Sequence, residues 1–392
     1  MRYKAVVFDF DGTICDTGEG IMKSVKYALD DYNIDSPDWN ELSFFIGPPL
    51  LVSFQERFNV SADLAGELVE KFRERYAEKG VFECSLYSGI TELLKSLKNH
   101  GVKIGIASSK PQVFIEKILD KFQIKHYFDC IAGVTFNADC ESKASIISRC
   151  VKELGEDKKD VIVAGDRKFD IDGASALLID SCAVLWGYGS KFEFIEHGAT
   201  FIAEKVQDVE AVALGFFEQT QEVKPYLDGR IINVHVDTVM MCNKTMAQRE
   251  TVDHPGGVAV CAVDNESNVL LVRQFRYPYK EIIYEIPAGK LERGENPEKA
   301  AVREFEEECG AVAGKFFSLG ELYPTPGYCA EIIRMYGAED ITYTDQNLDE
   351  DEFLEVVKIP LAECVKMVMS GEIKDSKTIA AIMKMNYLKS NK

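Results

Sequence analysis

The chain has 392 residues, of which 45 are Lys or Arg and 65 are Asp or Glu, giving a net charge of −20. At about 150 residues per domain this length predicts two or three domains, and a hydrophobic content of 46% is sufficient for globular cores. The negative charge argues against binding nucleic acid or anionic membranes through a basic patch. No apolar run approaches the roughly 20 residues of a membrane span. The N-terminus enters a strand pattern without a signal-peptide pattern, so we expect a cytoplasmic protein.

The eleven cysteines occur without a CxxC pair and at irregular spacing. This pattern predicts reduced thiols rather than disulfides. A zinc site is not expected, because neither the cysteines nor the five histidines cluster at ligand spacing.

Strand and helix signals alternate through residues 1–215, which predicts a parallel sheet with helices on both faces. The interval 17–85 is almost wholly helical, so we expect a helical insertion after the first strand. Residues 216–225 form a polar stretch that ends in proline, which we interpret as a linker. Short strand-like runs and fewer helices follow in residues 226–392, and these predict a separate α+β domain.

The first strand pattern, Val6-Val-Phe-Asp9-Phe-Asp11-Gly12-Thr, ends in two carboxylates. Strand alternation places Asp9 and Asp11 on one face, at the carboxyl end where open α/β sheets bind ligands. A divalent cation would relieve their repulsion. A calcium loop of the EF-hand type does not fit, because Gly12 comes too early.

Three later features extend this acidic motif. Ser108 follows the strand-like run 102–107, and its hydroxyl can hold a phosphoryl oxygen. Lys143 precedes a helical run and can neutralise the same group, although Lys110 is an alternative for that role. A third strand-like run leads into a further acidic pair, Asp166 and Asp170.

In this order, the residues resemble the haloacid dehalogenase superfamily of phosphatases across 1–215. The resemblance implies a Rossmann-like domain with a helical cap at about 17–85. The run Phe44–Leu50 is similar to the phosphoglycolate-phosphatase branch, in which a lid favours small substrates. Asp9 is then the nucleophile that forms an aspartyl-phosphate, Asp11 the general acid and base, and Ser108 and Lys143 clamp the phosphoryl group. The residues expected around Mg²⁺ are Asp9, Asp11, Asp166 and Asp170.

A second acidic constellation lies in the segment Gly289–Ala311, where a helix is predicted from Pro297 to a stop at Gly310. Glutamates stand at i, i+3 and i+4 of this helix and share one face. A solvated acidic face would account for the glutamates alone. It would not account for the surrounding pattern of Gly289, Glu295, Arg303 and Gly310.

This string resembles the Nudix box, with Phe305 and Ala311 where aliphatic residues are usual. The resemblance implies an α/β/α sandwich that hydrolyses a diphosphate with Mg²⁺, or with Mn²⁺ in its place. Arg303 is expected to orient the glutamates, with Glu295 supporting the loop. The expected metal-binding residues are Ala288, through its carbonyl, and Glu304, Glu307 and Glu308, with Glu307 and Arg303 also taking part in catalysis.

Flanking segments are similar to ADP-ribose pyrophosphatases, in which a proline follows the box at about the position of Pro326. The residues that match that subgroup's substrate region are Arg276, Glu285, Pro326 and Glu331. The acidic stretch 349–352 matches a loop that supplies a catalytic glutamate, with Glu350 as the first choice and Glu352 as the second. A plain acidic loop is the alternative.

The sequence therefore predicts a bifunctional hydrolase acting on small phosphate and diphosphate substrates. The C-terminal half would convert ADP-ribose, or a related nucleoside diphosphate derivative, to AMP and ribose 5-phosphate, and the N-terminal half would hydrolyse a small phosphomonoester. By analogy, a homodimer through the Nudix half is expected. The alternatives are a Nudix half acting on another nucleotide sugar or dinucleotide beside an unrelated phosphoglycolate phosphatase, or one half serving as a nucleotide sensor without turnover.

Overall fold

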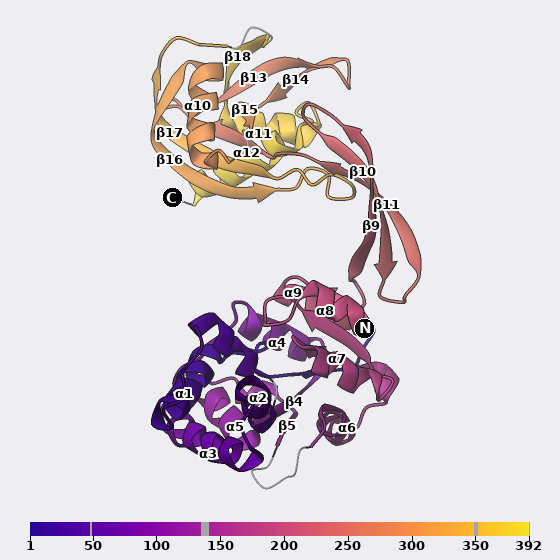
Figure 1. Cartoon of the computed structure of the whole chain (residues 1–392). Helices are drawn as coiled ribbons and strands as arrows, with labels where there is room; N and C mark the ends of the chain where they lie inside the picture. Colours follow the sequence, from indigo (N-terminus) through magenta and orange to yellow (C-terminus); the bar gives the residue numbers. More distant parts are fainter. Residues whose placement is uncertain (48, 135–140, 293, 349–351, 392) are drawn as a thin grey trace. The chain divides into compact units, whose positions relative to one another are not determined.

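The computed structural model describes residues 1–47, 49–134, 141–292, 294–348 and 352–391 (Figure 1). These residues form two compact units, Met1–Gln219 with Met240–Met246 and Thr220–Val239 with Ala247–Lys392. The cysteines in the described ranges are free thiols. None of the described helices is long and apolar enough to cross a membrane.

The first unit is built on a six-stranded sheet in the order β5-β4-β1-β6-β7-β8, in which all neighbouring strands are parallel. Successive strands extend to one side of β1 and then to the other, so the strand order reverses beside β1. Ligands of open α/β sheets bind at such a switch point, outside the carboxyl ends of the strands. The strands are β1 Ala5–Phe8, β4 Lys103–Pro111, β5 Cys130–Val134, β6 Val161–Gly165, β7 Asp180–Val184 and β8 Phe201–Ala203.

Both faces of this sheet are buried by helices. Val6 and Phe8 of β1 belong to one apolar cluster, together with residues of α4, α5 and α9. Ala5 and Val7 point the other way, into a cluster with α6 and α7. The alternation of a strand thus explains why β1 is apolar at every position. The helices are α4 Ile90–Asn99, α5 Gln112–Lys121, η3 Lys125–Tyr127, α6 Lys143–Leu154, η4 Lys158–Asp160, α7 Lys168–Ser175, α8 Lys191–Glu196 and α9 Val206–Leu214.

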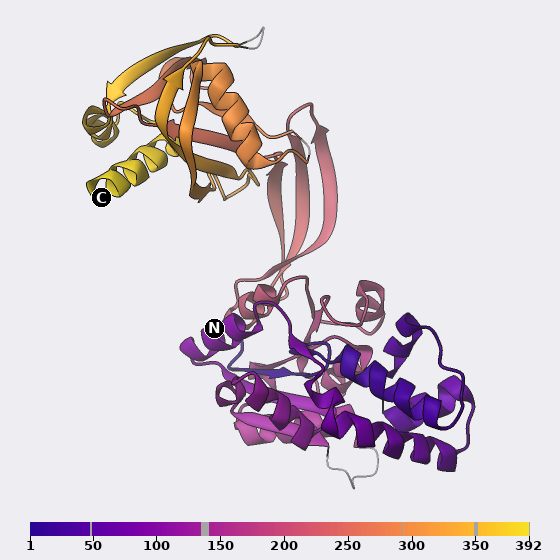
Figure 2. The ribbon, with the colours of Figure 1, turned by 90° about the vertical axis from the view of Figure 1, so that its left-hand side faces the viewer.

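A helical insertion leaves and rejoins the sheet through two short strands, β2 Cys15–Asp16 and β3 Ser85–Leu86. These strands pair with each other, so the chain enters and leaves the insertion side by side. The indigo helices of the insertion form a separate group beside the sheet (Figure 2). They are α1 Gly18–Asp31, η1 Trp39–Phe45, α2 Leu50–Phe58, α3 Ala62–Glu78 and η2 Gly80–Phe82.

The second unit contains a mixed four-stranded sheet, β15-β12-β17-β16, and two three-stranded sheets, β11-β10-β9 and β14-β13-β18. Strand β12 is buried along its whole length. One face of β12 packs in a cluster with α10, and the other face packs in a cluster with α11 and α12. Figure 2 shows orange α10 and the yellow helices on opposite sides of the strands. The elements are β9 Glu218–Asp228, β10 Asn233–Met241, β11 Met246–Asp253, β12 Gly257–Ala262, β13 Asn268–Arg276, β14 Glu281–Glu285, β15 Ala288–Lys290, α10 Pro297–Cys309, β16 Ala311–Leu322, β17 Ile333–Tyr343, β18 Leu354–Pro360, α11 Leu361–Ser370 and α12 Ser376–Ser390.

The predicted fold class is confirmed: a Rossmann-like parallel sheet covered by helices is followed by a unit of mixed sheets between helices. The segment 216–225 differs from the sequence interpretation, because most of it lies in strand β9. This strand is at the edge of its sheet and almost wholly exposed, so its residues carry no alternation of polar and apolar types. An edge strand also tolerates Pro225, which cannot donate to a neighbouring strand.

Phe305 offers a test of packing in the second unit. Its side chain is 1% exposed in the cluster between α10 and β12, whereas Phe353 of the same unit is 81% exposed. Phe305→Ala should lower the free energy of unfolding by about 3–5 kcal/mol through lost burial and a residual cavity. Phe353→Ala, the matched control, should change it by less than about 0.5 kcal/mol. Urea titration followed by circular dichroism measures both, and equal effects would contradict the packing.

Candidate active sites

Three carboxylates of the first unit meet at the carboxyl ends of neighbouring strands. Asp9 follows β1, and Asp166 follows β6, which pairs with β1. Asp170 lies in the first turn of α7, the helix that begins two residues after Asp166. All three residues are buried, and one oxygen from each lies within 4.8 Å of the others. The sheet topology therefore assembles three of the four residues that the sequence assigns to Mg²⁺.

Glycines make room for these carboxylates. A Cβ atom at Gly165 would lie 2.2 Å from Asp170 Cγ, and one at Gly187 would lie 2.3 Å from Asp166 Cβ. Gly12 has a φ of +81°, and a Cβ there would lie 2.2 Å from Asp166 Oδ2. None of these three glycine positions therefore has space for a residue with a side chain.

The cluster carries more negative than positive charge. Burial raises the pKa of Asp166, and the nearby charges of Asp170 and Asp9 raise it further. Burial also raises the pKa of Asp170, to about 6, although the Lys143 ammonium opposes this shift. Among the described residues, Asp170 Oδ1 accepts no hydrogen bond of good geometry, although Lys143 Nζ lies 2.6 Å from it. Three buried oxygen donors with unbalanced charge fit a hard cation such as Mg²⁺.

Lys143 is the cation at this cluster. Its Nζ lies 2.6 Å from Asp9 Oδ1 and 2.6 Å from Asp170 Oδ1. Lys110, the alternative in the sequence, contacts a different carboxylate: its Nζ lies 2.9 Å from Asp11 Oδ1. The structure thus places Lys143, and not Lys110, beside the expected nucleophile.

Asp11 does not join the close cluster of three carboxylates. Both of its oxygens accept hydrogen bonds from Lys110, at 2.9 and 3.2 Å, and Thr17 Oγ1 donates to Oδ1 at 2.6 Å. Ser108 is buried on the adjacent strand, and its Oγ accepts a hydrogen bond from the Lys110 backbone N–H at 3.4 Å. Asp11 therefore has its own set of partners, apart from the candidate metal site.

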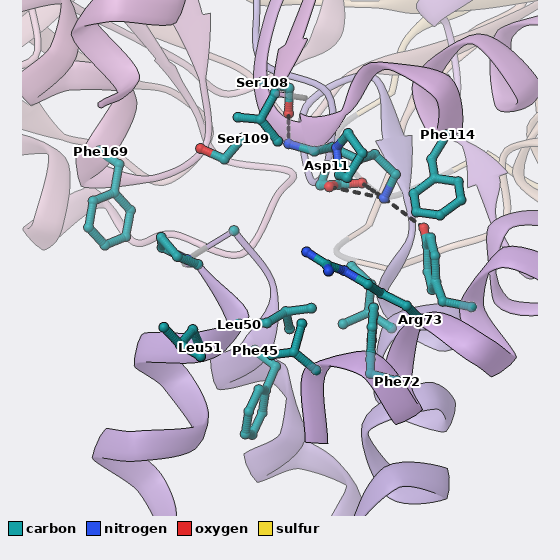
Figure 3. Close-up of a pocket in the computed structure, with 18 of the residues that line it drawn as sticks. Asp11, Phe45, Leu50, Leu51, Phe72, Arg73, Ser108, Ser109, Phe114 and Phe169 are labelled. Atoms are coloured by element: carbon teal, nitrogen blue, oxygen red, sulfur yellow. Dashed lines mark hydrogen bonds and ion pairs between the residues drawn. The ribbon is translucent and has the colours of Figure 1, made fainter. Parts of the chain in front are cut away.

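A cavity of about 470 Å³ connects these groups with the helical insertion. Figure 3 shows Asp11 and Ser108 on one side of it and Phe45, Leu50 and Phe72 on the other. The run Phe44–Leu50, singled out in the sequence, thus contributes to the lining. Sequence reasoning missed further lining residues, because they come from elements far apart in the chain. Among them are Arg73 and Tyr76 of α3, Phe114 of α5, and Arg167 and Phe169 at the start of α7.

The second acidic site lies on α10. Asn296 Oδ1 caps this helix by accepting from the Lys299 N–H at 3.1 Å, and Gly310 ends it with a φ of +57°. Arg303 links three acidic residues of the motif. Its guanidinium lies 3.3 Å from Glu295 Oε1, 3.0 Å from Glu304 Oε1 and 2.9 Å from Glu307 Oε2.

Glu308 is the most buried of the described carboxylates on α10, with 3% of its surface exposed. Burial raises its pKa to about 8, and the negative charges of Glu352 and Glu304 contribute to the shift. Its Oε2 accepts a hydrogen bond from the Ala288 N–H at 3.0 Å. A Cβ at Gly289 would lie 1.9 Å from Glu304 Cδ, so Glu304 packs directly on the glycine. These oxygen donors also fit Mg²⁺, although the described carboxylates here do not form as close a group as those in the first unit.

The expected substrate residues are only partly brought together. Arg276 Nε donates to Glu285 Oε1 at 2.8 Å, and a second contact joins Arg276 Nη2 to Glu285 Oε2. Buried Lys377 also contacts Glu285, at 3.2 Å, and sequence reasoning missed this residue because it lies 92 positions away. Glu331 Oε1 lies 3.6 Å from His254 Nδ1, and Pro326 lies in a loop after β16.

Of the two candidate loop glutamates, Glu350 lies outside the described residues. Glu352 is described, and its charge acts on both Glu304 and Glu308. Glu352, the second choice, therefore lies close enough to these two glutamates for its charge to raise their pKa values.

The raised pKa of Glu308 predicts a pH dependence of stability in the metal-free protein. The native carboxyl keeps its proton up to about pH 8, whereas the unfolded chain releases it near pH 4. The native state then binds more protons between these values, so its unfolding free energy falls as the pH rises, by at most roughly 5 kcal/mol. Glu308→Gln cannot titrate and should flatten the profile. Urea unfolding in EDTA between pH 5 and 8 measures it, and identical profiles would contradict the prediction.

Comparisons with known proteins agree with this division of the chain. The model of haloacid dehalogenase-like hydrolases matches residues 6–184, and the NUDIX domain model matches residues 253–381. An ADP-ribose pyrophosphatase of Bacillus subtilis is 42% identical over 167 residues, which are 42% of this chain and 90% of the relative. A 5'-nucleotidase of Pseudomonas aeruginosa is 36% identical over 200 residues, which are 51% of this chain and 90% of the relative.

A solved structure extends the comparison for the first unit. A predicted phosphatase from Clostridium acetobutylicum is 37% identical, with a TM-score of 0.53, and the match covers 55% of this chain and 99% of that one. Enzymes of both families generally use Mg²⁺. The chain therefore belongs to the haloacid dehalogenase-like hydrolases through its N-terminal part and to the Nudix hydrolases through its C-terminal part.

Proposed function

We propose that the chain is a bifunctional hydrolase in which a product of one activity can be the substrate of the other. The Nudix part cleaves ADP-ribose, or a closely related nucleoside diphosphate derivative, to AMP and ribose 5-phosphate. The other part hydrolyses a phosphomonoester through an aspartyl-phosphate. One observation carries the proposal: both families' acidic clusters are present, each held by a cationic side chain, Lys143 in one and Arg303 in the other.

In the phosphatase part, the Asp9 carboxylate attacks phosphorus and the bond to the leaving oxygen breaks. Asp11 gives a proton to that oxygen, and then takes one from the water that releases inorganic phosphate from Asp9. Lys143 and Ser108 hold the phosphoryl oxygens. Mg²⁺ bound by Asp9, Asp166 and Asp170 would supply positive charge between the carboxylate and the phosphate.

In the Nudix part, Glu304, Glu307 and Glu308 would hold Mg²⁺, or Mn²⁺, and the bound metal would polarise the diphosphate. Arg303 keeps two of these glutamates in place through its contacts with Glu304 and Glu307. A loop glutamate takes the proton from the attacking water. The charge of Glu352 at Glu304 and Glu308 supports this residue for the role, with Glu350 as the other candidate.

The cavity supports a nucleoside monophosphate as the substrate of the phosphatase part. Its volume is about 470 Å³, and apolar side chains of the insertion, among them Phe45, Leu50 and Phe72, line the side opposite Ser108. A nucleobase can use such a surface, whereas ribose 5-phosphate and phosphoglycolate have little apolar area to bury. The similarity to a 5'-nucleotidase points in the same direction.

From the similarity to ADP-ribose pyrophosphatases alone, we also propose a homodimer formed through the Nudix part. Light scattering of the full chain tests it, and a monomer would overturn it.

Glu308→Gln tests the diphosphatase. Mutation of residues that only support a metal ligand costs 10–100-fold, so loss of a ligand should lower ADP-ribose turnover at least about 100-fold. Glu306→Gln, the same change elsewhere on α10, is the matched control and should keep wild-type turnover. AMP formation measured by chromatography with Mg²⁺ reports both variants. Wild-type turnover in Glu308→Gln would remove this residue from the mechanism.

Phosphate release from ADP-ribose tests whether the two activities act in sequence. The wild type should release inorganic phosphate from ADP-ribose, because each product is a phosphomonoester. Asp9→Asn should stop at AMP and ribose 5-phosphate, while Glu308→Gln should release no phosphate from ADP-ribose but still dephosphorylate added AMP. If the wild type accumulates both monoesters unchanged, the two parts serve unrelated substrates.

A further inference from the structure

Lys110 is a buried cation that the proposed phosphatase chemistry leaves without a role. It is 7% exposed and lies at the carboxyl-terminal part of β4, in the lining of the cavity. Lys143 already occupies the position beside Asp9 and Asp170. A second buried lysine is costly to desolvate, so its partners indicate what it does.

The partners of Lys110 come from two parts of the unit. Its Nζ donates to both oxygens of Asp11, at 2.9 and 3.2 Å, and to Tyr76 Oη at 2.6 Å. Asp11 follows the central strand, whereas Tyr76 lies on α3 of the helical insertion. Lys110 therefore joins a core carboxylate to a cap hydroxyl.

Tyr76 is itself firmly held. Its ring stacks on Phe72 with centroids 5.1 Å apart, and it meets Phe114 edge to face at 5.3 Å. Burial raises the pKa of Tyr76 to about 12, so its hydroxyl is neutral at physiological pH and can accept from the ammonium. The hydroxyl thus limits where the end of the Lys110 side chain can lie.

Thr17 completes the set of contacts around Asp11. Its Oγ1 donates to Asp11 Oδ1 at 2.6 Å, from the residue that precedes α1. With the two bonds from Lys110, three hydrogen bonds fix the orientation of a carboxylate that is only 9% exposed. Among the described residues, Asp9 pairs with Lys143 and not with Lys110 or Thr17, so this arrangement orients Asp11.

We propose that Lys110, anchored by Tyr76, is a positioning residue that holds Asp11 for proton transfer to the leaving oxygen. The proposal rests on the proposed phosphatase function. In the step concerned, the bond between phosphorus and the leaving oxygen breaks as Asp9 takes the phosphoryl group. Protonated Asp11 gives its proton to the leaving oxygen and becomes the carboxylate that Lys110 and Thr17 bind. Lys110 contributes no atom to the products.

The choice of leaving group separates positioning of Asp11 from a general structural role. The alkoxide that leaves AMP is strongly basic and needs the proton, whereas p-nitrophenolate is stable without it. The ratio kcat/KM reports the steps up to release of the leaving group, and so excludes the later attack of water. A residue that serves Asp11 therefore affects kcat/KM for AMP much more than for p-nitrophenyl phosphate.

The experiment measures kcat/KM of the full chain with Mg²⁺ on both substrates. General acid catalysis contributes roughly 10²–10⁴-fold, so Asp11→Asn and Lys110→Met should each lower the value for AMP at least about 30-fold. Both should change the value for p-nitrophenyl phosphate less than about 3-fold. Because they act on one step, the double variant should lose no more than Asp11→Asn alone. Lys95→Met, an exposed lysine of α4, is the control and should leave both values unchanged.

Tyr76→Phe keeps the ring and removes only the hydroxyl, so it serves if Lys110→Met does not fold. It should lower kcat/KM for AMP about 3–10-fold, in the size range of one hydrogen bond, with little change for p-nitrophenyl phosphate. Equal losses on the two substrates in Lys110→Met, or an unchanged AMP value in a folded Tyr76→Phe, would overturn the proposal. A wrong phosphatase assignment would give a different result. The wild type would then hydrolyse neither substrate, or Asp9→Asn would be as active as the wild type.

Discussion

Burial of carboxylates shapes the electrostatics of both sites. In the first unit Asp9, Asp166 and Asp170 bring oxygens within 4.8 Å of one another at the end of an apolar sheet. Like charges so close interact strongly in a medium of low dielectric constant. Lys143 offsets part of this charge through two contacts of 2.6 Å, yet burial and, to a smaller extent, the charge of Asp9 still raise the pKa of Asp170 to about 6. The protein thus retains a cluster that a divalent cation would stabilise.

The two units reach this arrangement by different secondary structure but use the same local device. Parallel strands bring Asp9 and Asp166 together in the first unit, and one helix face aligns Glu304 and Glu308 in the second. In each, a glycine lies where any side chain would displace a carboxylate: Gly165 against Asp170, and Gly289 against Glu304. A cationic side chain then contacts two carboxylates in each site. Lys143 contacts Asp9 and Asp170, and Arg303 contacts Glu304 and Glu307. Close approach of backbone to carboxylate, more than fold, is what the two sites share.

The sequence predicts the relative placement of residues that are close in the chain better than that of residues far apart. The i, i+4 spacing of Glu304 and Glu308 follows from the period of a helix, so their common face can be predicted without a structure. The expected alternation of Asp9 and Asp11 does not apply, because β1 ends at Phe8 and both residues lie beyond it. The sequence also gives no sign of the partner of Asp11, because Lys110 is 99 residues away. The same holds for Lys377 and Glu285, which are 92 residues apart. Strand β9 escaped the sequence analysis for another reason: it is exposed on both faces, so burial imposes no pattern on it.

The overall charge of −20 raises the question of how the chain attracts anionic phosphates. Local charge decides, because screening limits bulk charges to about a Debye length, roughly 8 Å at physiological salt. Among the described residues, the lining of the cavity contains four cationic side chains, Arg73, Lys110, Lys143 and Arg167. Lys110 and Lys143 are already paired with carboxylates, so they cannot by themselves make the cavity strongly positive. A divalent cation bound at the carboxylates would offset two of the three negative charges of Asp9, Asp166 and Asp170, and Lys143 would balance the third. The negative charge of the cavity is thus what would bind the cation, and the cation in turn would remove the repulsion between the cavity and an anionic phosphate.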